Sequence, residues 1–235
     1  MADERAVAAH GARTAGGPDS PDGVGAGAGA VRASGLLVDW GGVMTTNLFR
    51  SFAAFCESEG LDPRAIVEAF TTDPEARDLL IGLEEGHVGE ATFERELGSL
   101  LGLPSHEGLI DRLFAGATPD ERMLDAVRAA RRGGVPTGLI SNSWGTTRYP
   151  RALLAELFDG VVISGEVGMR KPTPRIYELG AEAIGREPAQ CVFVDDLPFN
   201  LPPAQELGMS VVHHTDAAAT IAALERLLGL RLGLG

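Results

Sequence analysis

The stretch LLVDWGG, residues 36–42, places an acidic residue directly after three apolar ones. An apolar run without polar alternation is typical of a strand that is buried on both faces, as the strands of parallel sheets are. We therefore expect a buried parallel strand at residues 36–38, with Asp39 at its carboxyl end. Because open parallel sheets bind their ligands beyond that end of the strands, Asp39 is a candidate functional residue.

Strands and helices alternate in the rest of the chain after residue 118. Short apolar runs predict four further strands, at residues 136–140, 161–163, 191–194 and 210–212. Helical patterns lie between them, so the order indicates right-handed βαβ crossovers and an α/β fold with a doubly wound, parallel, Rossmann-like core. Thr118 with Glu121 is an expected capping box for the first helix of this part, and Asp216 is an expected N-cap for the last.

Residues 48–117 show helical periodicity and no convincing strand. Phe49 and Phe52 fall on one helical face, and Asp62 followed by Pro63 is typical of a second helix start. This segment is an expected compact helical insertion. The chain is then predicted to have three parts, a disordered N-terminal tail at residues 1–33, a core domain at residues 34–47 and 118–235, and the insertion at residues 48–117.

Composition narrows the classes of function. The tail is rich in Ala, Gly, Asp and Pro without apolar periodicity, which predicts disorder. The formal net charge of -13 argues against a nucleic-acid partner, because phosphate backbones are bound by clustered Lys and Arg. Cys56 and Cys191 lack metal-type spacing and are expected to be reduced thiols. No stretch has the length of a membrane span or the pattern of a secretory signal, so we expect a cytoplasmic protein.

Chemistry-bearing side chains follow several of the predicted strands. Ser141 follows the second strand, Asp195 and Asp196 follow the fourth, and Lys171, the only lysine of the chain, lies in a loop after the third. With Asp39, they are expected at one edge of the sheet. Facing carboxylates repel each other unless a cation lies between them, and an oxygen-only site of this kind suits Mg²⁺. An aspartate there can attack phosphorus in line while hydroxyl, backbone N–H and ammonium groups hold the phosphate oxygens.

Four segments resemble, in chain order, the four motifs of haloacid dehalogenase (HAD) superfamily hydrolases: LLVDWGGVM, GLISNSW, GMRKPTPRIYELG and CVFVDDLPFNLPPAQELGM. The last two are especially similar to the phosphatase domain of soluble epoxide hydrolases. The resemblance covers the chain from about residue 34 to its end. It implies that the helical insertion is a cap that closes over the site and selects substrate. It also implies a Mg²⁺-dependent phosphatase that cleaves a small phosphomonoester through an aspartyl-phosphate intermediate.

The resemblance implies a role for each matching residue. The catalytic residues would be the nucleophile Asp39 and Lys171, which orders nucleophile and phosphate. Phosphate would be bound by Ser141, Asn142 and Lys171. The ligands of Mg²⁺ would be Asp39, the backbone carbonyl of Gly41, Asp196 and, directly or through a neighbouring ligand, Asp195. The expected partner is a small phosphorylated metabolite, with no nucleic acid and no membrane, for a monomer or a homodimer.

Position 41 departs from the family pattern. Phosphatases of the superfamily usually carry a second aspartate there, which protonates the leaving group and then activates water. Gly41 has no side chain to do so, and such help is worth roughly 10²–10⁴-fold in rate. Three situations stay open: a substrate with a good leaving group, another proton donor such as Thr45, Thr46 or His87, or a regulatory protein that binds phosphate ligands and turns over poorly.

Two relatives with other chemistry were weighed against the residues present. Haloacid dehalogenases also lack the second aspartate and remain a third alternative, but they need no acidic pair in the fourth motif. Phosphonoacetaldehyde hydrolases use a cap lysine, which the insertion lacks.

Four further residues are expected near the site. Trp144, Arg148 and Tyr149 could either contact substrate or pack at the surface. Arg170 is expected to be solvated.

Overall fold

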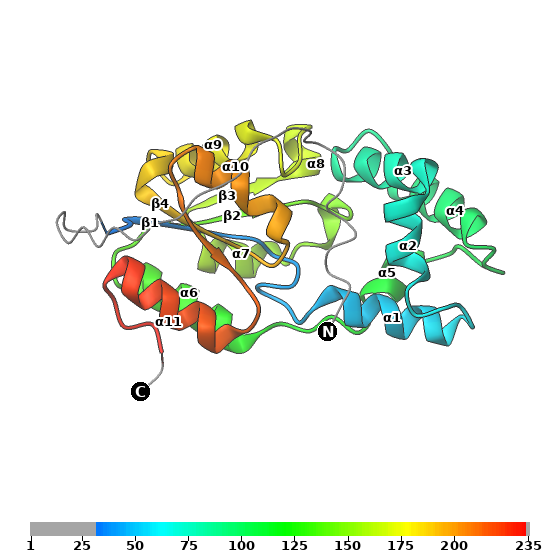
Figure 1. The fold of residues 1–235 in the computed structure, drawn as a ribbon, viewed down its shortest axis with the longest axis horizontal. Helices are drawn as coiled ribbons and strands as arrows, with labels where there is room; N and C mark the ends of the chain where they lie inside the picture. The colour runs from blue at the N-terminus through cyan, green and yellow to red at the C-terminus, as the bar shows by residue number, and fades with distance from the viewer. Residues whose placement is uncertain (1–31, 234–235) are drawn as a thin grey trace, which may run out of the picture.

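The computed structural model describes residues 32–233, so most of the predicted tail, residues 1–31, lies outside the described residues. Within that range the chain forms one parallel sheet of five strands in the order β3-β2-β1-β4-β5 (Figure 1). The strands are β1 (Gly35–Val38), β2 (Thr137–Ser141), β3 (Gly160–Ile163), β4 (Cys191–Asp195) and β5 (Ser210–His213). The predicted doubly wound α/β core is confirmed.

Strand β1 lies at the centre of the sheet, where Leu37 is opposite Gly138 of β2 on one side and Phe193 of β4 on the other. The strands that follow β1 along the chain extend the sheet first in one direction and then in the other. The strand order therefore reverses at β1, and open α/β sheets bind ligands at such a switch point. Asp39 follows directly after this strand.

Helices cover both faces of the sheet (Figure 1). One layer consists of α6 (Glu121–Arg132), α7 (Arg151–Leu157) and α11 (Ala217–Leu228), and the other of α9 (Pro174–Ala183) and α10 (Leu201–Glu206). The short α8 (Ser164–Val167) follows β3. Leu36 and Val38 pack into the first layer and Leu37 into the second. Alternate side chains of one strand thus enter different cores, which explains why β1 is apolar throughout.

The helical insertion lies beside the carboxyl end of the sheet (Figure 1). Its helices are α1 (Leu48–Ser58), α2 (Ala65–Thr72), α3 (Pro74–Glu84), α4 (Glu90–Leu100) and α5 (Leu109–Phe114), and they enclose an apolar core of their own. An inserted helical cap on a Rossmann-like core is therefore confirmed as the fold class. Neither α3 nor α5 was predicted from the sequence. Asp73, directly before Pro74, nevertheless caps α3 by accepting from the N–H groups of Glu75 and Ala76.

The two segments that join insertion and core run side by side. The Thr46 N–H donates to the Thr118 carbonyl at 2.7 Å, and the Thr118 N–H donates to Thr46 Oγ1 at 3.0 Å. Thr118 is therefore not the cap of α6, and the predicted capping box was wrong. Asp120 caps this helix instead, accepting from the N–H groups of Arg122 and Met123, because Thr118 is already engaged by the neighbouring segment.

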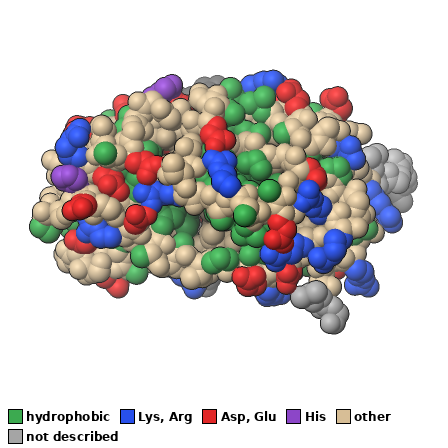
Figure 2. Space-filling model, turned by 180° about the vertical axis from the view of Figure 1, so that it is seen from behind, with side chains coloured by type: hydrophobic (Ala, Val, Ile, Leu, Met, Phe, Trp, Pro, Cys, Tyr) green, Lys and Arg blue, Asp and Glu red, His purple; other side chains and the backbone are tan. Residues whose placement is uncertain are grey.

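Acidic and basic side chains lie next to each other over much of the face shown in Figure 2. Typical pairs are Arg131 with Asp159 at 3.0 Å and Arg175 with Glu182 at 2.6 Å. Exposed pairs of this kind contribute only about 0–1 kcal/mol each, so the buried cores carry most of the stability. No helix within residues 32–233 is long and apolar enough to cross a membrane.

Residues 32–233 also contain three 3₁₀ helices: η2 (Thr146–Arg148), η3 (Pro188–Gln190) and η4 (Pro198–Asn200). Two of them shape the edge of the sheet that carries the candidate site. Helix η2 follows the loop after β2, and η4 follows the loop after β4. Asn142 and Trp144 of the first loop and Asp196 and Leu197 of the second line the same cavity.

Candidate active site

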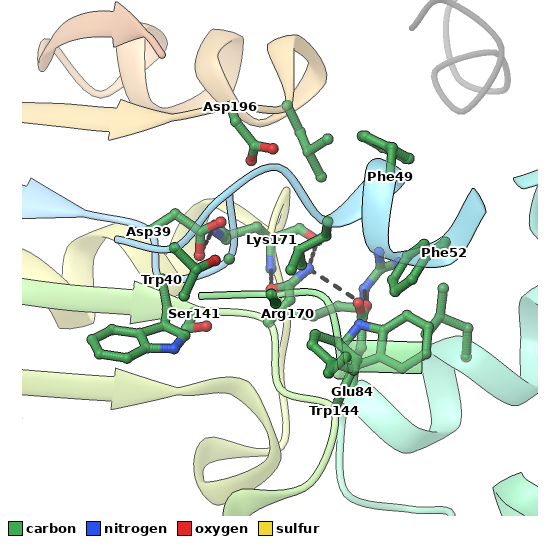
Figure 3. A pocket seen from close by; sticks show the side chains of 18 of the residues that line it. Asp39, Trp40, Phe49, Phe52, Glu84, Ser141, Trp144, Arg170, Lys171 and Asp196 are labelled. Carbon is green, nitrogen blue, oxygen red and sulfur yellow. Dashed lines mark hydrogen bonds and ion pairs between the residues drawn. The ribbon is translucent and has the colours of Figure 1, made fainter. Parts of the chain in front are cut away.

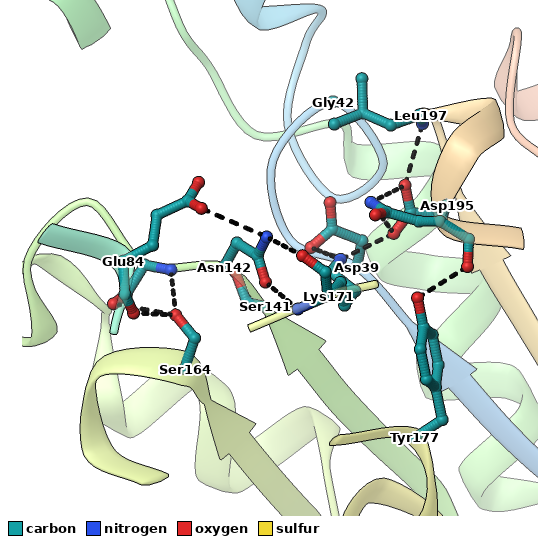
Figure 4. A network of polar contacts seen from close by, with 12 residues as sticks. Asp39, Gly42, Glu84, Ser141, Asn142, Ser164, Lys171, Tyr177, Asp195 and Leu197 are labelled. Carbon is teal, nitrogen blue, oxygen red and sulfur yellow. Dashed lines mark hydrogen bonds and ion pairs between the residues drawn. The ribbon is translucent and has the colours of Figure 1, made fainter. Parts of the chain in front are cut away.

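Two strand-end carboxylates meet at the only lysine of the chain (Figure 4). Lys171 Nζ lies 2.8 Å from Asp39 Oδ1 and 2.6 Å from Asp195 Oδ2. All three side chains are buried, Lys171 being only 1% exposed. The strand order makes this contact possible, since β1 and β4 are neighbours and the loop before α9 passes over their ends. The structure thus brings together three residues that the sequence placed in one site.

Asp195 is held from several sides. Its carboxylate accepts from the Leu197 N–H at 2.9 Å and from the Asn200 side-chain amide at 3.0 and 3.1 Å, besides Lys171. The Tyr177 hydroxyl in turn donates to the Asn200 carbonyl at 2.7 Å. Both oxygens of Asp195 are therefore engaged by protein groups. This favours a role in orienting Lys171 over direct metal binding.

Asp196 completes an acidic cluster. Carboxylate oxygens of Asp39, Asp195 and Asp196 lie within 4.8 Å of one another, and Asp196 has no ion-pair partner among the described residues. Gly42 packs on it so closely that a Cβ would lie 2.2 Å from Asp196 Oδ2, and its φ of +77° also favours glycine. The donor set is all oxygen with a surplus of negative charge, which fits Mg²⁺. Asp39 and Asp196 would hold the ion.

The protonation states reflect the same charge surplus. Burial, together with the carboxylates of Asp39 and Asp195, raises the pKa of Asp196 to about 8. Burial also raises the pKa of Asp39 to about 6, although the Lys171 ammonium opposes the rise. For Lys171, burial lowers the pKa, but the two carboxylates outweigh it and the pKa is raised. A divalent cation beside Asp39 and Asp196 would favour their charged forms.

Ser141 and Asn142 line the same cavity at the end of β2. The Ser141 hydroxyl shares a hydrogen bond of 2.8 Å with the Tyr149 hydroxyl. The Asn142 amide donates to the Lys171 carbonyl at 3.1 Å, and its oxygen accepts from the Lys171 N–H at 2.8 Å. Asn142 thus fixes the backbone of Lys171. Phosphate binding by Ser141 and Asn142 stays a prediction.

Glu84 is a site residue that was not predicted from the sequence, and Arg170 was expected to be a solvated residue that could add positive potential. Glu84 ends α3 of the insertion, and its carboxylate forms an ion pair with Arg170 Nε (Figure 3). The expectation of a solvated Arg170 was wrong, because only 21% of its side chain is exposed. Burial raises the pKa of Glu84 to about 7, against the opposing effect of Arg170. Both residues line the cavity.

The cavity has a volume of about 540 Å³ and two unlike ends. Its polar end contains Asp39, Lys171 and Asp196, and its other end is walled by apolar side chains of the insertion (Figure 3). These include Phe49, Phe52, Val67, Phe70, Leu80 and Phe114. The cavity therefore suits a ligand with a small anionic head and an apolar body.

Trp144 connects the apolar core of the insertion with the apolar end of the cavity. It belongs to the loop after β2, yet its ring centroid lies 5.5 Å from Phe52, 5.7 Å from Phe70 and 5.3 Å from Phe114. Aromatic contacts of this kind contribute about 0.5–1.5 kcal/mol each beyond burial. The question left open by the sequence is thus answered: Trp144 packs into the core of the insertion and also lines the cavity.

The three proton donors that the sequence suggests, Thr45, Thr46 and His87, differ in their position relative to the cavity. Thr45 lines the cavity, and its hydroxyl donates to the Thr46 carbonyl at 3.2 Å. Thr46 is exposed. The His87 side chain is 70% exposed and pairs with Glu85 at 3.6 Å. A Cβ on Gly41 would lie 2.7 Å from the end of the Leu48 side chain.

The family model and several of the relatives that match this chain carry the names of hydrolases or phosphatases. A family model described as haloacid dehalogenase-like hydrolase matches residues 30–208. A bifunctional epoxide hydrolase 2 from Rattus norvegicus is 30% identical over 128 residues, which are 52% of this chain and 23% of that protein. The chain thus matches about a quarter of the length of that relative. A sesquiterpene phosphatase from Aspergillus oryzae is 33% identical over 153 residues, 62% of this chain and 77% of that protein.

The fold also matches solved structures. A HAD family enzyme from Bacteroides thetaiotaomicron, solved in complex with magnesium and inorganic phosphate, superposes with a TM-score of 0.60. It shares 24% sequence identity, and the alignment covers 77% of this chain and 93% of that one. At this identity the likeness supports the fold.

Proposed function

The chain belongs to the haloacid dehalogenase-like hydrolase family, and we propose that within it the protein is a Mg²⁺-dependent phosphomonoester hydrolase with Asp39 as nucleophile. The observation that carries the proposal is the contact of Asp39 with Lys171 at 2.8 Å, beside the carboxylate of Asp196. A nucleophilic carboxylate, a fixed ammonium and an acidic metal-binding partner are the groups that phosphoryl transfer requires. Relatives named as phosphatases support the same reaction.

The roles follow from the contacts. The Asp39 carboxylate attacks phosphorus, and the Lys171 ammonium neutralises charge on nucleophile and phosphoryl oxygens. Asp195 holds Lys171 in place from the other side. Asp39, Asp196 and the Gly41 carbonyl would hold Mg²⁺, which would supply Lewis-acid charge beside the phosphoryl group. Water then releases phosphate from the aspartyl phosphate and restores Asp39.

The substrate proposed from the cavity is a phosphate ester of an apolar alcohol. A sugar phosphate would place hydroxyl groups against Phe49, Phe70 and Phe114, and an unpaired buried polar group costs about 1–3 kcal/mol. Asp111 and Arg148, which also line the cavity, are paired with each other. The Aspergillus relative is named a sesquiterpene phosphatase, and the carbon skeleton of a sesquiterpene is apolar. A cytoplasmic location and the choice between monomer and homodimer remain predictions.

A panel assay tests the proposed function. Purified protein with Mg²⁺ is given prenyl, alkyl, aryl and sugar phosphates, and released phosphate is measured. We expect turnover of the first three classes, with the highest kcat/KM for apolar esters, and none by Asp39→Asn. Phosphate binding without turnover of any ester would favour the alternative of a regulatory, poorly catalytic protein, which Gly41 keeps in view.

Magnesium is expected to stabilise the protein through Asp196. At about one hundred times its dissociation constant a ligand stabilises by about 2.7 kcal/mol, or roughly 5–10 °C in Tm for a domain of this size. Thermal unfolding with and without Mg²⁺ measures this. In Asp196→Asn the response should vanish, while the metal-free variant unfolds above metal-free wild type because one repelling carboxylate is gone. An unchanged Mg²⁺ response in the variant would remove Asp196 from the metal site.

A charged side chain introduced into the apolar end of the cavity should weaken the binding of apolar substrates only. Phe49 lines the cavity and is partly exposed, so Phe49→Arg is expected to fold. We expect KM for a prenyl phosphate to rise roughly 10–200-fold, the range for a poorly matched apolar pocket, with little change for a small acyl phosphate. Leu100→Arg, on α4 and outside the cavity lining, is the matched control. Equal effects of both variants would contradict the assignment.

A further inference from the structure

We propose that Glu84 is the proton-transfer residue of the reaction, supplied by the helical insertion in place of the side chain missing at position 41. The inference rests on the proposed phosphatase function. The Glu84 carboxylic acid protonates the departing alcohol, and the resulting carboxylate accepts a proton from the attacking water. The juxtaposition that points to it is an acidic side chain of the insertion within the same cavity as Asp39.

Glu84 lies on the side of the cavity where a leaving group would be. Asp39 attacks from the end of β1, and in an in-line displacement the leaving oxygen lies opposite the nucleophile, hence towards the insertion. Glu84 Oε2 accepts from the Asn142 amide at 3.4 Å, and Asn142 contacts Lys171 in turn (Figure 4). Only 7% of the Glu84 side chain is exposed. Its carboxyl group therefore faces the site.

The end of α3 is attached to the core, which fixes Glu84 relative to Asp39. The Glu84 carbonyl, left without a helical partner at the end of α3, accepts from the Ser164 hydroxyl. Ser164 accepts in turn from the Ser143 N–H at 2.8 Å. Two residues on, a Cβ on Gly86 would lie 2.7 Å from the Gly165 carbonyl. Position 86 therefore has no room for a side chain, and the chain there packs directly on the Gly165 backbone.

The charged groups around Glu84 set its protonation. Burial raises its pKa to about 7, the Arg170 and Lys171 cations lower it, and Asp39 raises it. Tyr149 also faces it, as the Glu84 charge contributes to the raised pKa of that phenol. Near neutral pH both forms of Glu84 are populated. A group that donates in one step and accepts in the next needs this balance.

Other groups near the site are less suited than Glu84 to transfer a proton. The Tyr149 hydroxyl is bonded to Ser141, and burial raises its pKa far above neutrality. The Thr45 hydroxyl is a very weak acid and already donates to a backbone carbonyl. The His87 side chain is largely exposed and is not part of the cavity lining.

The two steps balance as follows. In the first step an Asp39 oxygen forms a bond to phosphorus while the bond from phosphorus to the alcohol oxygen breaks. The alcohol oxygen takes the Glu84 proton. The products are an alcohol, aspartyl phosphate and the Glu84 carboxylate. Water then bonds to phosphorus and loses a proton to Glu84, while the bond from phosphorus to Asp39 breaks. Inorganic phosphate leaves, and both side chains return to their starting forms.

Pre-steady-state kinetics of Glu84→Gln test the inference with two substrates. p-Nitrophenolate leaves without a proton, so the variant should release it in a first-turnover burst at the wild-type rate. Turnover after the burst should be slowed roughly 10²–10⁴-fold, because water lacks its base. With an alkyl phosphate the first turnover itself should be slowed by that factor. Wild-type alkyl cleavage should also decline as pH rises through about 7, and the variant should lack this decline.

Glu90→Gln is the matched control. Glu90 is another carboxylate of the insertion that pairs with a core arginine, Arg148, at 2.9 Å, but it is not part of the cavity lining. We expect any loss there to be equal for both substrates and without change in the pH profile. Equal slowing of both bursts in Glu84→Gln, or no slowing of alkyl cleavage, would overturn the inference while leaving the phosphatase proposal intact. Failure of wild type to cleave any phosphate ester would instead refute the proposed function.

Discussion

Asp39→Asn is expected to lower phosphate release by about 10⁴-fold or more, the scale on which loss of a covalent nucleophile acts. The amide keeps the shape of the side chain but cannot form the aspartyl phosphate. Folding should be preserved, because Lys171 keeps its 2.6 Å contact with Asp195. Released phosphate and thermal unfolding measure the two effects.

The stability of Asp39→Asn gives a second measurable effect. Burial raises the pKa of Asp39 to about 6, so its charged form is unfavourable in the fold relative to the unfolded chain. The cost is absent at low pH and present above about 6. Without metal, Asp39→Asn should therefore be at least as stable as wild type in neutral solution. A strongly destabilised variant would show that Asp39 has a structural role that the contacts do not explain.

Lys171→Met is expected to have the largest effect on stability. It removes the cation that pairs with Asp39 and Asp195 while keeping an apolar stem of similar length. Breaking a buried ion pair from one side costs about 3–5 kcal/mol, because uncompensated charge is left in the interior. Urea unfolding should show a loss of this size near neutral pH, together with loss of phosphate release.

The pH dependence of this loss follows from Asp39. Because the Lys171 ammonium lowers the pKa of Asp39, removing it raises that pKa further, and the variant is penalised where Asp39 must be charged. The penalty should shrink as pH falls and Asp39 takes up a proton. Adding Asp195→Asn to Lys171→Met should restore part of the stability but no activity. A loss below about 1 kcal/mol, the size of an exposed pair, would contradict the buried-pair account.

The sheet and its acidic edge could be predicted because the information is local. Three of the apolar runs are followed directly by a residue of the site: 36–38 by Asp39, 136–140 by Ser141 and 191–194 by Asp195. Parallel strands with a fixed crossover hand then bring their carboxyl ends to one edge. No side-chain detail was needed for Asp39, Lys171 and Asp195 to be placed in one site.

The far wall of the site could not be predicted because its contacts are long-range. Glu84 and Arg170 are adjacent only after the insertion has docked, and sequence alone does not distinguish Glu84 from its neighbour Glu85. One signal was present: Asp73 followed by Pro74 is typical of a helix start and predicts α3, the helix that ends at Glu84. Glu84 was missed because this helix start was not recognised. Trp144 gave no comparable local signal, since its partners lie in the insertion.

Acid-quenched peptide mass spectrometry of a single turnover tests the central claim most directly. Wild-type protein with Mg²⁺ and a prenyl or aryl phosphate is stopped within the first turnover and digested. One phosphoryl group is expected on the peptide that contains Asp39, appearing before inorganic phosphate and absent from Asp39→Asn. Phosphate release at full rate with no phosphorylated peptide, or with the label on another residue, would contradict the account.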